Sequence, residues 1–124
     1  MRTVSADPSE IFAKMVSICE TWDGVLDDIC NAEGLRRSDA DVLLVLDGSD
    51  GISPGSLARR VGLTSGGITA RIDRLERDGL IRRFPDPDDR RGLRVQLTSA
   101  GQVMAGSLTE GIRRAQGSLR SPRG

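Results

Sequence analysis

The sequence contains no histidine and no tyrosine, and it has only two cysteines, Cys19 and Cys30. These cysteines are too far apart to form a CxxC motif, and histidine, the usual companion of cysteine in zinc sites, is absent. Histidine is also the side chain that most often acts as a general base near neutral pH. We therefore expect no metal site and no bound cofactor.

Sequence motifs for catalysis are missing as well. No HExxH, GxSxG or Walker P-loop pattern occurs. Adjacent acids such as Asp27 and Asp28 point about 100° apart if they lie on a helix, so they do not make a paired carboxylate site. We expect that the protein is not an enzyme.

Long hydrophobic stretches are absent too. The longest aliphatic run is Val42–Leu46, far shorter than the roughly 20 residues that cross a bilayer as a helix. The opening MRTVSADPSEIF has no apolar segment typical of a signal peptide. The sequence predicts a soluble, cytoplasmic protein with no membrane partner.

Charge is present in equal amounts of both signs but is unevenly distributed. Residues 1–50 carry four basic and eleven acidic residues, whereas residues 51–124 carry fourteen basic and seven acidic ones. This division is compatible with two parts that have different partners, and equally with two solvated faces of one domain. The chain length of 124 residues suits one compact domain.

The first predicted element is a long helix over residues 8–31. Asp7 is a suitable N-cap, Pro8 suits the first helical position, and Gly34 follows the end. Apolar residues recur every three or four positions and predict one broad apolar stripe. Its members are Ile11, Phe12, Met15, Ile18, Cys19, Trp22, Leu26, Ile29 and Cys30.

Three shorter helices follow. Ser38 is the expected N-cap of a helix over residues 39–46, and Ser53 caps a third helix that Gly62 closes. Thr64 caps a fourth helix that ends at Gly79. Two short helices joined by a tight turn with glycine are typical of a helix-turn-helix.

A small β-hairpin and a last helix complete the pattern. Residues 81–84 predict a strand, residues 85–92 a polar turn, and residues 93–97 a half-buried strand. A hairpin directly after a helix-turn-helix is a wing. A helix begins after Thr98 with Val103, Met104 and Leu108 as its apolar residues. Beyond about Arg114 the sequence becomes polar, and we expect SPRG to be a frayed tail.

The run LARRVGLTSGGITARIDRLERDGLIRRFPDPDDRRGLRVQLTSAG, residues 57–101, resembles the MarR family of transcription regulators. The segments DRLERDGLIRR, DPDDRRG and LTSAG carry this resemblance through their order and spacing. It implies a mainly α fold with a small β-wing, a winged helix-turn-helix with N- and C-terminal dimerisation helices. It also implies a transcriptional regulator, by default a repressor, that binds pseudo-palindromic double-stranded DNA as a homodimer.

The expected organisation has three parts. Residues 1–37 form an N-terminal dimerisation region, residues 38–98 the DNA-binding domain, and residues 99–124 a C-terminal helix and tail. Family members usually continue past Leu119 with another substantial helix, so this chain is a C-terminally short member. The dimer interface is then reduced, built mainly from residues 8–31 and 99–114, or missing.

The fourth predicted helix is the recognition helix, which enters the major groove and reads bases mainly near its N-terminus. Gly66 and Gly67 either let the backbone approach DNA closely or mark a loosely formed first turn. We expect modest discrimination by side chains and more by DNA shape. The predicted contacts on this helix are Ser65, Gly66, Gly67, Thr69, Arg71 and Arg74.

Arg90 and Arg91 at the wing tip suit a narrow minor groove. The resemblance implies that Asp73 pairs with Arg91 and orients the wing. Arg59 and Arg60 on the third helix either touch phosphates or belong to a solvated face, and the sequence does not decide between these alternatives.

Members of the family often release DNA when a small, frequently phenolic molecule binds between the dimer interface and the DNA-binding lobe. Met15 and Trp22 are candidates for lining a cleft for such a small aromatic ligand. Cys19 and Cys30 lie on the apolar stripe, which favours small buried thiols. Some members of the family sense oxidants through a cysteine, and this alternative stays open here, although no histidine or tyrosine is present to assist the thiols.

Two other functions remain open from the sequence. Winged helices also serve as protein-interaction modules, although such a module should lack arginines on the recognition helix and wing. A truncated relative that binds DNA weakly is the other alternative.

Overall fold

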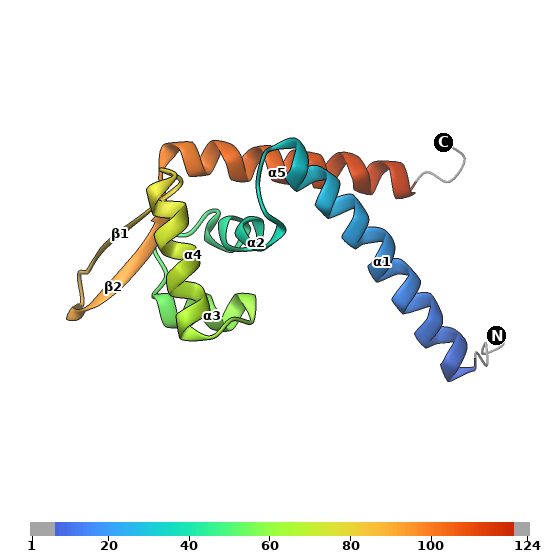
Figure 1. The fold of residues 1–124 in the computed structure, drawn as a ribbon, viewed down its shortest axis with the longest axis horizontal. Helices are drawn as coiled ribbons and strands as arrows, with labels where there is room; N and C mark the ends of the chain where they lie inside the picture. The colour runs from blue at the N-terminus through green and yellow to red at the C-terminus, as the bar shows by residue number, and fades with distance from the viewer. Residues whose placement is uncertain (1–6, 121–124) are drawn as a thin grey trace, which may run out of the picture.

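The computed structural model describes residues 7–120, with side chains described up to residue 117. These residues form five helices and one two-stranded antiparallel sheet (Figure 1). The fold is the winged helix-turn-helix expected from the sequence. The elements in chain order are α1 (Pro8–Ala32), α2 (Arg37–Leu46), α3 (Pro54–Val61), α4 (Ser65–Arg77), β1 (Ile81–Asp86), β2 (Asp89–Leu97) and α5 (Ser99–Arg120).

Helix α1 begins and ends where the sequence predicts. The Asp7 carboxylate accepts a hydrogen bond from the Ser9 backbone N–H at 3.3 Å, and Pro8 occupies the first turn. Only the last part of the helix packs on the rest of the chain, and Cys30 is its one buried residue. The first half extends away from the other helices (Figure 1).

Helix α2 begins two residues earlier than predicted, and Ser38 is not its N-cap. The cap is Arg36, whose carbonyl accepts from the backbone N–H groups of Asp39 and Ala40 and whose side chain makes no cap hydrogen bond. Helix α2 also supplies the largest share of the core, since Val42, Leu43 and Leu46 are fully or almost fully buried.

Helices α3 and α4 form the helix-turn-helix. The Ser53 hydroxyl accepts from the Ser56 N–H at 3.2 Å, and the Thr64 hydroxyl accepts from the Gly67 N–H at 3.1 Å, which confirms both predicted caps. Gly62 adopts φ 73°, a left-handed conformation that glycine reaches without steric cost. This conformation ends α3 and allows the short turn into α4.

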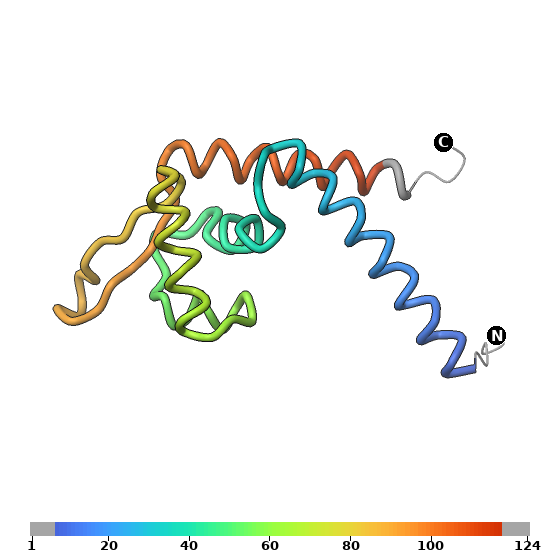
Figure 2. The backbone as a smooth tube through the Cα atoms, viewed as in Figure 1, coloured from blue at the N-terminus to red at the C-terminus, as the bar shows by residue number. Residues whose placement is uncertain are grey.

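The wing is longer and its turn shorter than the sequence predicts. The strands pair from Ile81 with Leu97 out to Asp86 with Asp89, so only Pro87 and Asp88 lie outside them. The polar residues at the tip lack apolar alternation and so predict a loop. Asp86 nevertheless pairs with Asp89 there, after a register shift between Pro85 and Asp86 that leaves residues 90–92 without a partner in the ladder. Ile52 adds a short third pairing with Val95 at the base of the wing. The backbone trace in Figure 2 shows the wing as a narrow loop projecting from the helices.

Helix α5 packs across α1 and α2 after a close approach to the start of β1. A Cβ atom added at Gly101 would lie 1.9 Å from the carbonyl oxygen of Leu80, so no larger residue fits there. The helix extends to Arg120, past the expected change at Arg114. Val103 is 72% exposed and does not face the core, whereas Ala105 and Leu108 do. The predicted frayed tail, residues 121–124, lies outside the described residues.

Within residues 7–120 no helix combines the length and the hydrophobicity needed to cross a lipid bilayer.

Candidate nucleic-acid interface

The first turn of α4 is exposed and bears little side-chain bulk. Ser65, Gly66 and Thr69 are exposed, and Gly67 is half-buried. A Cβ atom at Gly66 would meet nothing within 4 Å, so glycine is not required there by packing. The Thr69 hydroxyl donates to the Ser65 carbonyl at 2.9 Å, which fixes its orientation on the helix surface. This turn therefore offers polar backbone and two hydroxyls to a partner that can approach closely.

Two arginines predicted to contact DNA from α4 have partners inside the chain. The Arg74 guanidinium forms an ion pair and two hydrogen bonds with the Asp39 carboxylate on α2. The hydrogen bonds that Arg74 donates to Asp39 raise the pKa of Arg74 above its usual value. Arg71 donates to the Ser38 carbonyl at 3.1 Å. Both side chains tie α4 to α2.

Asp39 is 4% exposed, and no motif in the sequence marks it as a functional residue. Asp39 precedes the apolar residues of α2 that enter the core. Burial of an unpaired carboxylate there would be unfavourable, so its position in the sequence indicates a basic partner.

A second arginine cluster ties α4 to the wing. Asp73 forms an ion pair with Arg83 of β1. The pairing of Asp73 with Arg91, which the resemblance implied, is therefore wrong. Arg83 also binds Glu76, through its guanidinium and through its backbone N–H at 3.1 Å. The hydrogen bond that Arg83 donates to Asp73 raises the pKa of Arg83. Asp73 thus contacts the base of the wing and not its tip.

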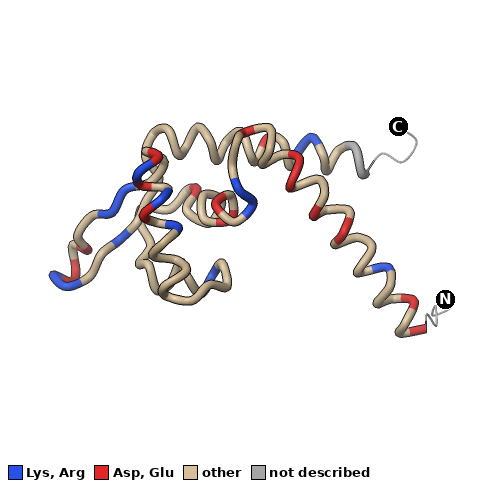
Figure 3. Tube along the Cα trace, in the orientation of Figure 1, with Lys and Arg blue, Asp and Glu red and all other residues tan. Residues whose placement is uncertain are grey.

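The wing tip presents Arg90 and Arg91, both exposed, at the far end of the hairpin (Figure 3). Asp86 accepts from the Asp88 N–H at 2.9 Å, and Asp89 accepts from the Arg91 N–H at 3.0 Å. The backbone N–H of Asp88, together with Arg94, lowers the pKa of Asp86. These turn carboxylates are bound to the hairpin backbone, and the neighbouring arginine side chains point into open solvent space.

The winged helix-turn-helix has clear relatives. The sequence profile of the MarR family matches residues 33–92. The transcriptional repressor YetL of Bacillus subtilis is 30% identical over 102 residues, which is 81% of this chain and 61% of YetL. The chain belongs to the MarR family.

A second curated relative is similar in sequence, and a solved structure is similar in fold. The regulator PecS of Dickeya dadantii is 26% identical over 86% of this chain and 66% of its own length. The chain therefore spans less than two thirds of the length of either curated relative. The crystal structure of RV1404 from Mycobacterium tuberculosis superposes with a TM-score of 0.84 at 21% identity, covering 98% of this chain and 84% of that protein.

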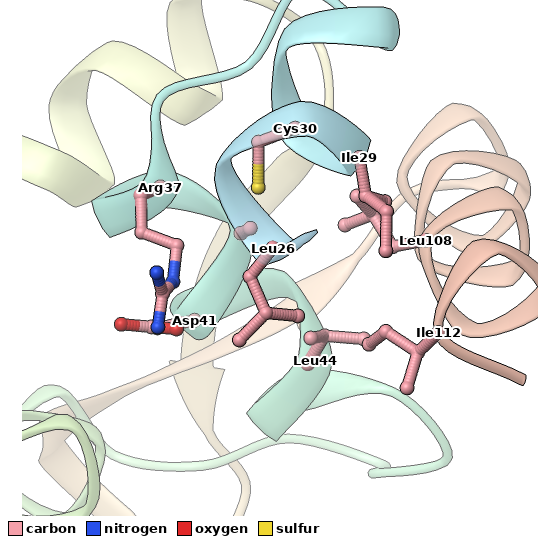
Figure 4. Close-up of a pocket in the computed structure, with 9 residues that line it drawn as sticks. Leu26, Ile29, Cys30, Arg37, Asp41, Leu44, Leu108 and Ile112 are labelled. Carbon is pink, nitrogen blue, oxygen red and sulfur yellow. The ribbon is translucent and has the colours of Figure 1, made fainter. Parts of the chain in front are cut away.

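In this MarR-family chain, a small cavity lies where α1, α2 and α5 meet (Figure 4). It has a volume of about 110 Å³ and a mostly apolar lining, with Arg37 and Asp41 on one side. Arg37 also binds Asp23 and Asp27 of α1, at 3.2 and 3.5 Å. The cavity is lined by Leu26, Ile29, Cys30, Arg37, Ala40, Asp41, Leu44, Leu108 and Ile112.

The residues predicted to line a ligand cleft lie elsewhere on α1. Met15 is 58% exposed on the free half of the helix. Trp22 borders a shallow hollow whose other lining residues, Ser17, Ile18 and Thr21, also belong to α1. Neither Met15 nor Trp22 lines the cavity between the three helices, because that cavity begins one turn further along α1, at Leu26.

The two cysteines differ in their surroundings. Cys30 is buried at the cavity, and desolvation raises the pKa of its thiol. Cys19 is exposed, so the expectation of a buried thiol is wrong for this residue. The same apolar stripe contains both cysteines, but among residues 7–117 only its last part packs against other elements.

Proposed function

We propose that this protein is a sequence-specific, double-stranded-DNA-binding transcription regulator that acts as a repressor. One observation carries the proposal: an exposed, glycine-containing first turn of α4 lies in the same unit as an arginine-tipped wing that is tied to α4 through Arg83. A fixed distance between recognition helix and wing suits two adjacent grooves of one duplex.

In the proposed complex the N-terminal turn of α4 enters the major groove. Ser65 and Thr69 supply hydroxyls for base edges, and Gly66 and Gly67 let the backbone approach the DNA. Arg71 and Arg74 hold α4 on α2 instead of reading bases, since their guanidinium groups are already bound. Arg90 and Arg91 occupy the minor groove, where the negative potential favours arginine.

The proposed active form is a homodimer. The first half of α1 exposes apolar side chains over several turns, and no other described part of the chain buries them. A second copy would cover this face through α1 and α5 and would place two recognition helices on a two-fold-symmetric site. The exposed apolar side chains of α1 are Ile11, Phe12, Met15, Val16 and Ile18.

A small aromatic ligand is proposed to act at the α1–α2–α5 cavity. The volume of about 110 Å³ is below the roughly 150 Å³ of an engineered cavity that accepts benzene. An aromatic ring would therefore push α1 and α5 away from α2, and it would move the dimer helices relative to the helix-turn-helix. DNA release would follow from that displacement.

Selection from a random duplex library tests the DNA-binding proposal. We expect enrichment of a two-fold-symmetric sequence whose half-sites lie about one helical turn apart. The Arg90→Ala/Arg91→Ala double variant should lose affinity for the selected duplex in fluorescence anisotropy.

The control is Arg36→Ala/Arg77→Ala, which removes the same charge from two exposed positions outside the wing and outside the expected dimer helices, and it should bind like the unmodified protein. No enrichment, together with equal affinity for all duplexes, would contradict sequence-specific binding.

A further inference from the structure

A polar hollow lies between the start of α3 and strand β2. Its volume is about 250 Å³ and its lining is mostly polar. It lies where Ile52, just before α3, pairs with Val95 of the wing. The hollow therefore sits between the wing and α3, the helix that precedes the proposed recognition helix α4. It is lined by Gly51, Ile52, Ser53, Ser56, Arg60 and Arg94.

Arg94 is held in position on the wing side of this hollow. Its guanidinium donates to the Gly51 carbonyl at 3.0 Å. Its Nε lies 3.3 Å from an Asp86 oxygen, an ion pair without hydrogen-bond geometry that leaves this buried nitrogen unbonded. Asp86 offsets part of the positive charge of Arg94, so an anion in the hollow needs a second cation.

Arg60 of α3 lines the same hollow and would supply that second cation, which favours the phosphate-contact alternative for Arg60. Arg60 lines the hollow and is exposed. Arg59 lies along α3 instead, with a guanidinium nitrogen 3.8 Å from the position of a Cβ atom on Gly55. Two adjacent arginines on one helix thus have different surroundings.

Hydroxyl donors complete the lining. Ser53 accepts the N-cap hydrogen bond from Ser56 N–H at 3.2 Å, and its hydroxyl proton stays available to donate. Ser56 also lines the hollow. Two guanidinium groups and two hydroxyls suit the tetrahedral oxygens of a phosphate. A contact to a backbone phosphate does not distinguish one base from another.

We infer that this hollow binds a phosphate of the DNA backbone between the groove that α4 enters and the groove that the wing enters. The inference rests on the proposed DNA-binding function. A phosphate held between Arg60 and Arg94 would fix the protein along the duplex, since backbone contacts set register and orientation.

The test compares Arg60→Ala with Arg59→Ala, which removes the same charge one residue away. The dissociation constant for one duplex is measured by fluorescence anisotropy from low to high salt. Each phosphate contact contributes about 0.9 to the slope of log affinity against log salt. The proposed homodimer loses one contact in each protomer, so we expect Arg60→Ala to reduce the slope by about 1.8 and Arg59→Ala to leave it unchanged. An unchanged slope for Arg60→Ala, or equal changes for both variants, would overturn the inference.

A second measurement separates failure of this site from failure of the proposed function. Inorganic phosphate is titrated into the free protein while the backbone amide signals of Ser53 and Ser56 are followed by NMR. A saturable shift that Arg60→Ala abolishes and Arg59→Ala retains supports an anion site even if no duplex binds. A saturable shift with an unchanged DNA salt slope means that the hollow takes a free anion, and it overturns the DNA contact. No shift in the unmodified protein, together with an unchanged slope, overturns both.

Discussion

The ion pair between Arg74 and Asp39 connects α4 with α2, and its two side chains are unequally buried. The Asp39 side chain is 5% exposed and that of Arg74 is 26% exposed. Loss of the arginine leaves a carboxylate buried without its partner, whereas loss of the aspartate leaves a flexible cation that can turn toward water. The two single substitutions should therefore differ in cost.

We expect Arg74→Met to lower the free energy of unfolding by about 3 kcal/mol and Asp39→Ala by about 1 kcal/mol. Urea unfolding at neutral pH measures both. Because Arg74 is bound within the chain, Arg74→Met should leave the salt dependence of DNA binding unchanged. A reduced salt slope in a variant that remains folded would show that Arg74 contacts DNA after all.

Cys30 links burial to a pH dependence. Desolvation raises its pKa above the ordinary value of 9.0, so the folded protein keeps the thiol proton to higher pH than the unfolded chain does. The contribution of Cys30 to stability is then complete below pH 9 and declines as the pH rises through the folded value.

We expect the difference in the free energy of unfolding between the unmodified protein and Cys30→Ala to narrow as the pH rises above 9. Chemical unfolding at a series of pH values, under reducing conditions, measures this difference. Cys19→Ala removes an exposed thiol from the same helix and is the matched control. A difference that stays constant across the series would show that burial does not shift the titration of Cys30.

At the scale of elements, a substitution of Gly66 should change helix stability and DNA affinity in opposite directions. Nothing lies within 4 Å of a Cβ atom at this position, so Gly66→Ala should stabilise α4 by about 1 kcal/mol. If the first turn of α4 approaches DNA closely, the added methyl group should weaken binding.

Gly24→Ala is the matched control, because Gly24 lies inside α1 with equally open space around it. We expect both variants to melt at higher temperature and only Gly66→Ala to lose DNA affinity. Equal affinity for both variants would indicate that the first turn of α4 is loosely formed and does not approach DNA.

The positions of the elements could be predicted from local signals, but their connections could not. Asp7, Ser53, Thr64 and Gly62 mark helix ends because capping involves atoms only a few residues apart. The partner of Arg83 could not be read in this way, since Asp73 is ten residues away on another element. Arg74 and Asp39 are 35 residues apart, and only packing of α4 on α2 brings them together.

Apolar periodicity predicted the helices better than it predicted their partners. Leu26 and Phe12 belong to the same stripe of α1, yet Leu26 lines the cavity and Phe12 is 67% exposed. Val103 was likewise expected in the core and faces outward. An apolar stripe on a helix predicts that this face is buried. It does not predict whether the face packs against the same chain or against a partner protein.

At the scale of the whole molecule, the unburied half of α1 predicts that stability depends on protein concentration. If a second copy covers this face, folding and association are coupled, and the midpoint of thermal unfolding rises with concentration. Met15 lies within the exposed stripe and is 58% exposed in the single chain. A charge at this position costs little in a monomer and much in an apolar interface.

We expect the unmodified protein to be a dimer by light scattering and Met15→Asp to be a monomer with a concentration-independent unfolding midpoint. Ser17→Asp places the same charge on an exposed residue of α1 that is about 160° around the helix from Met15, and it should remain a dimer. A monomeric unmodified protein would mean that α1 and α5 do not suffice as an interface. Dimers in all three proteins would place the interface away from the α1 stripe, and two recognition helices would then need a different symmetric arrangement on DNA.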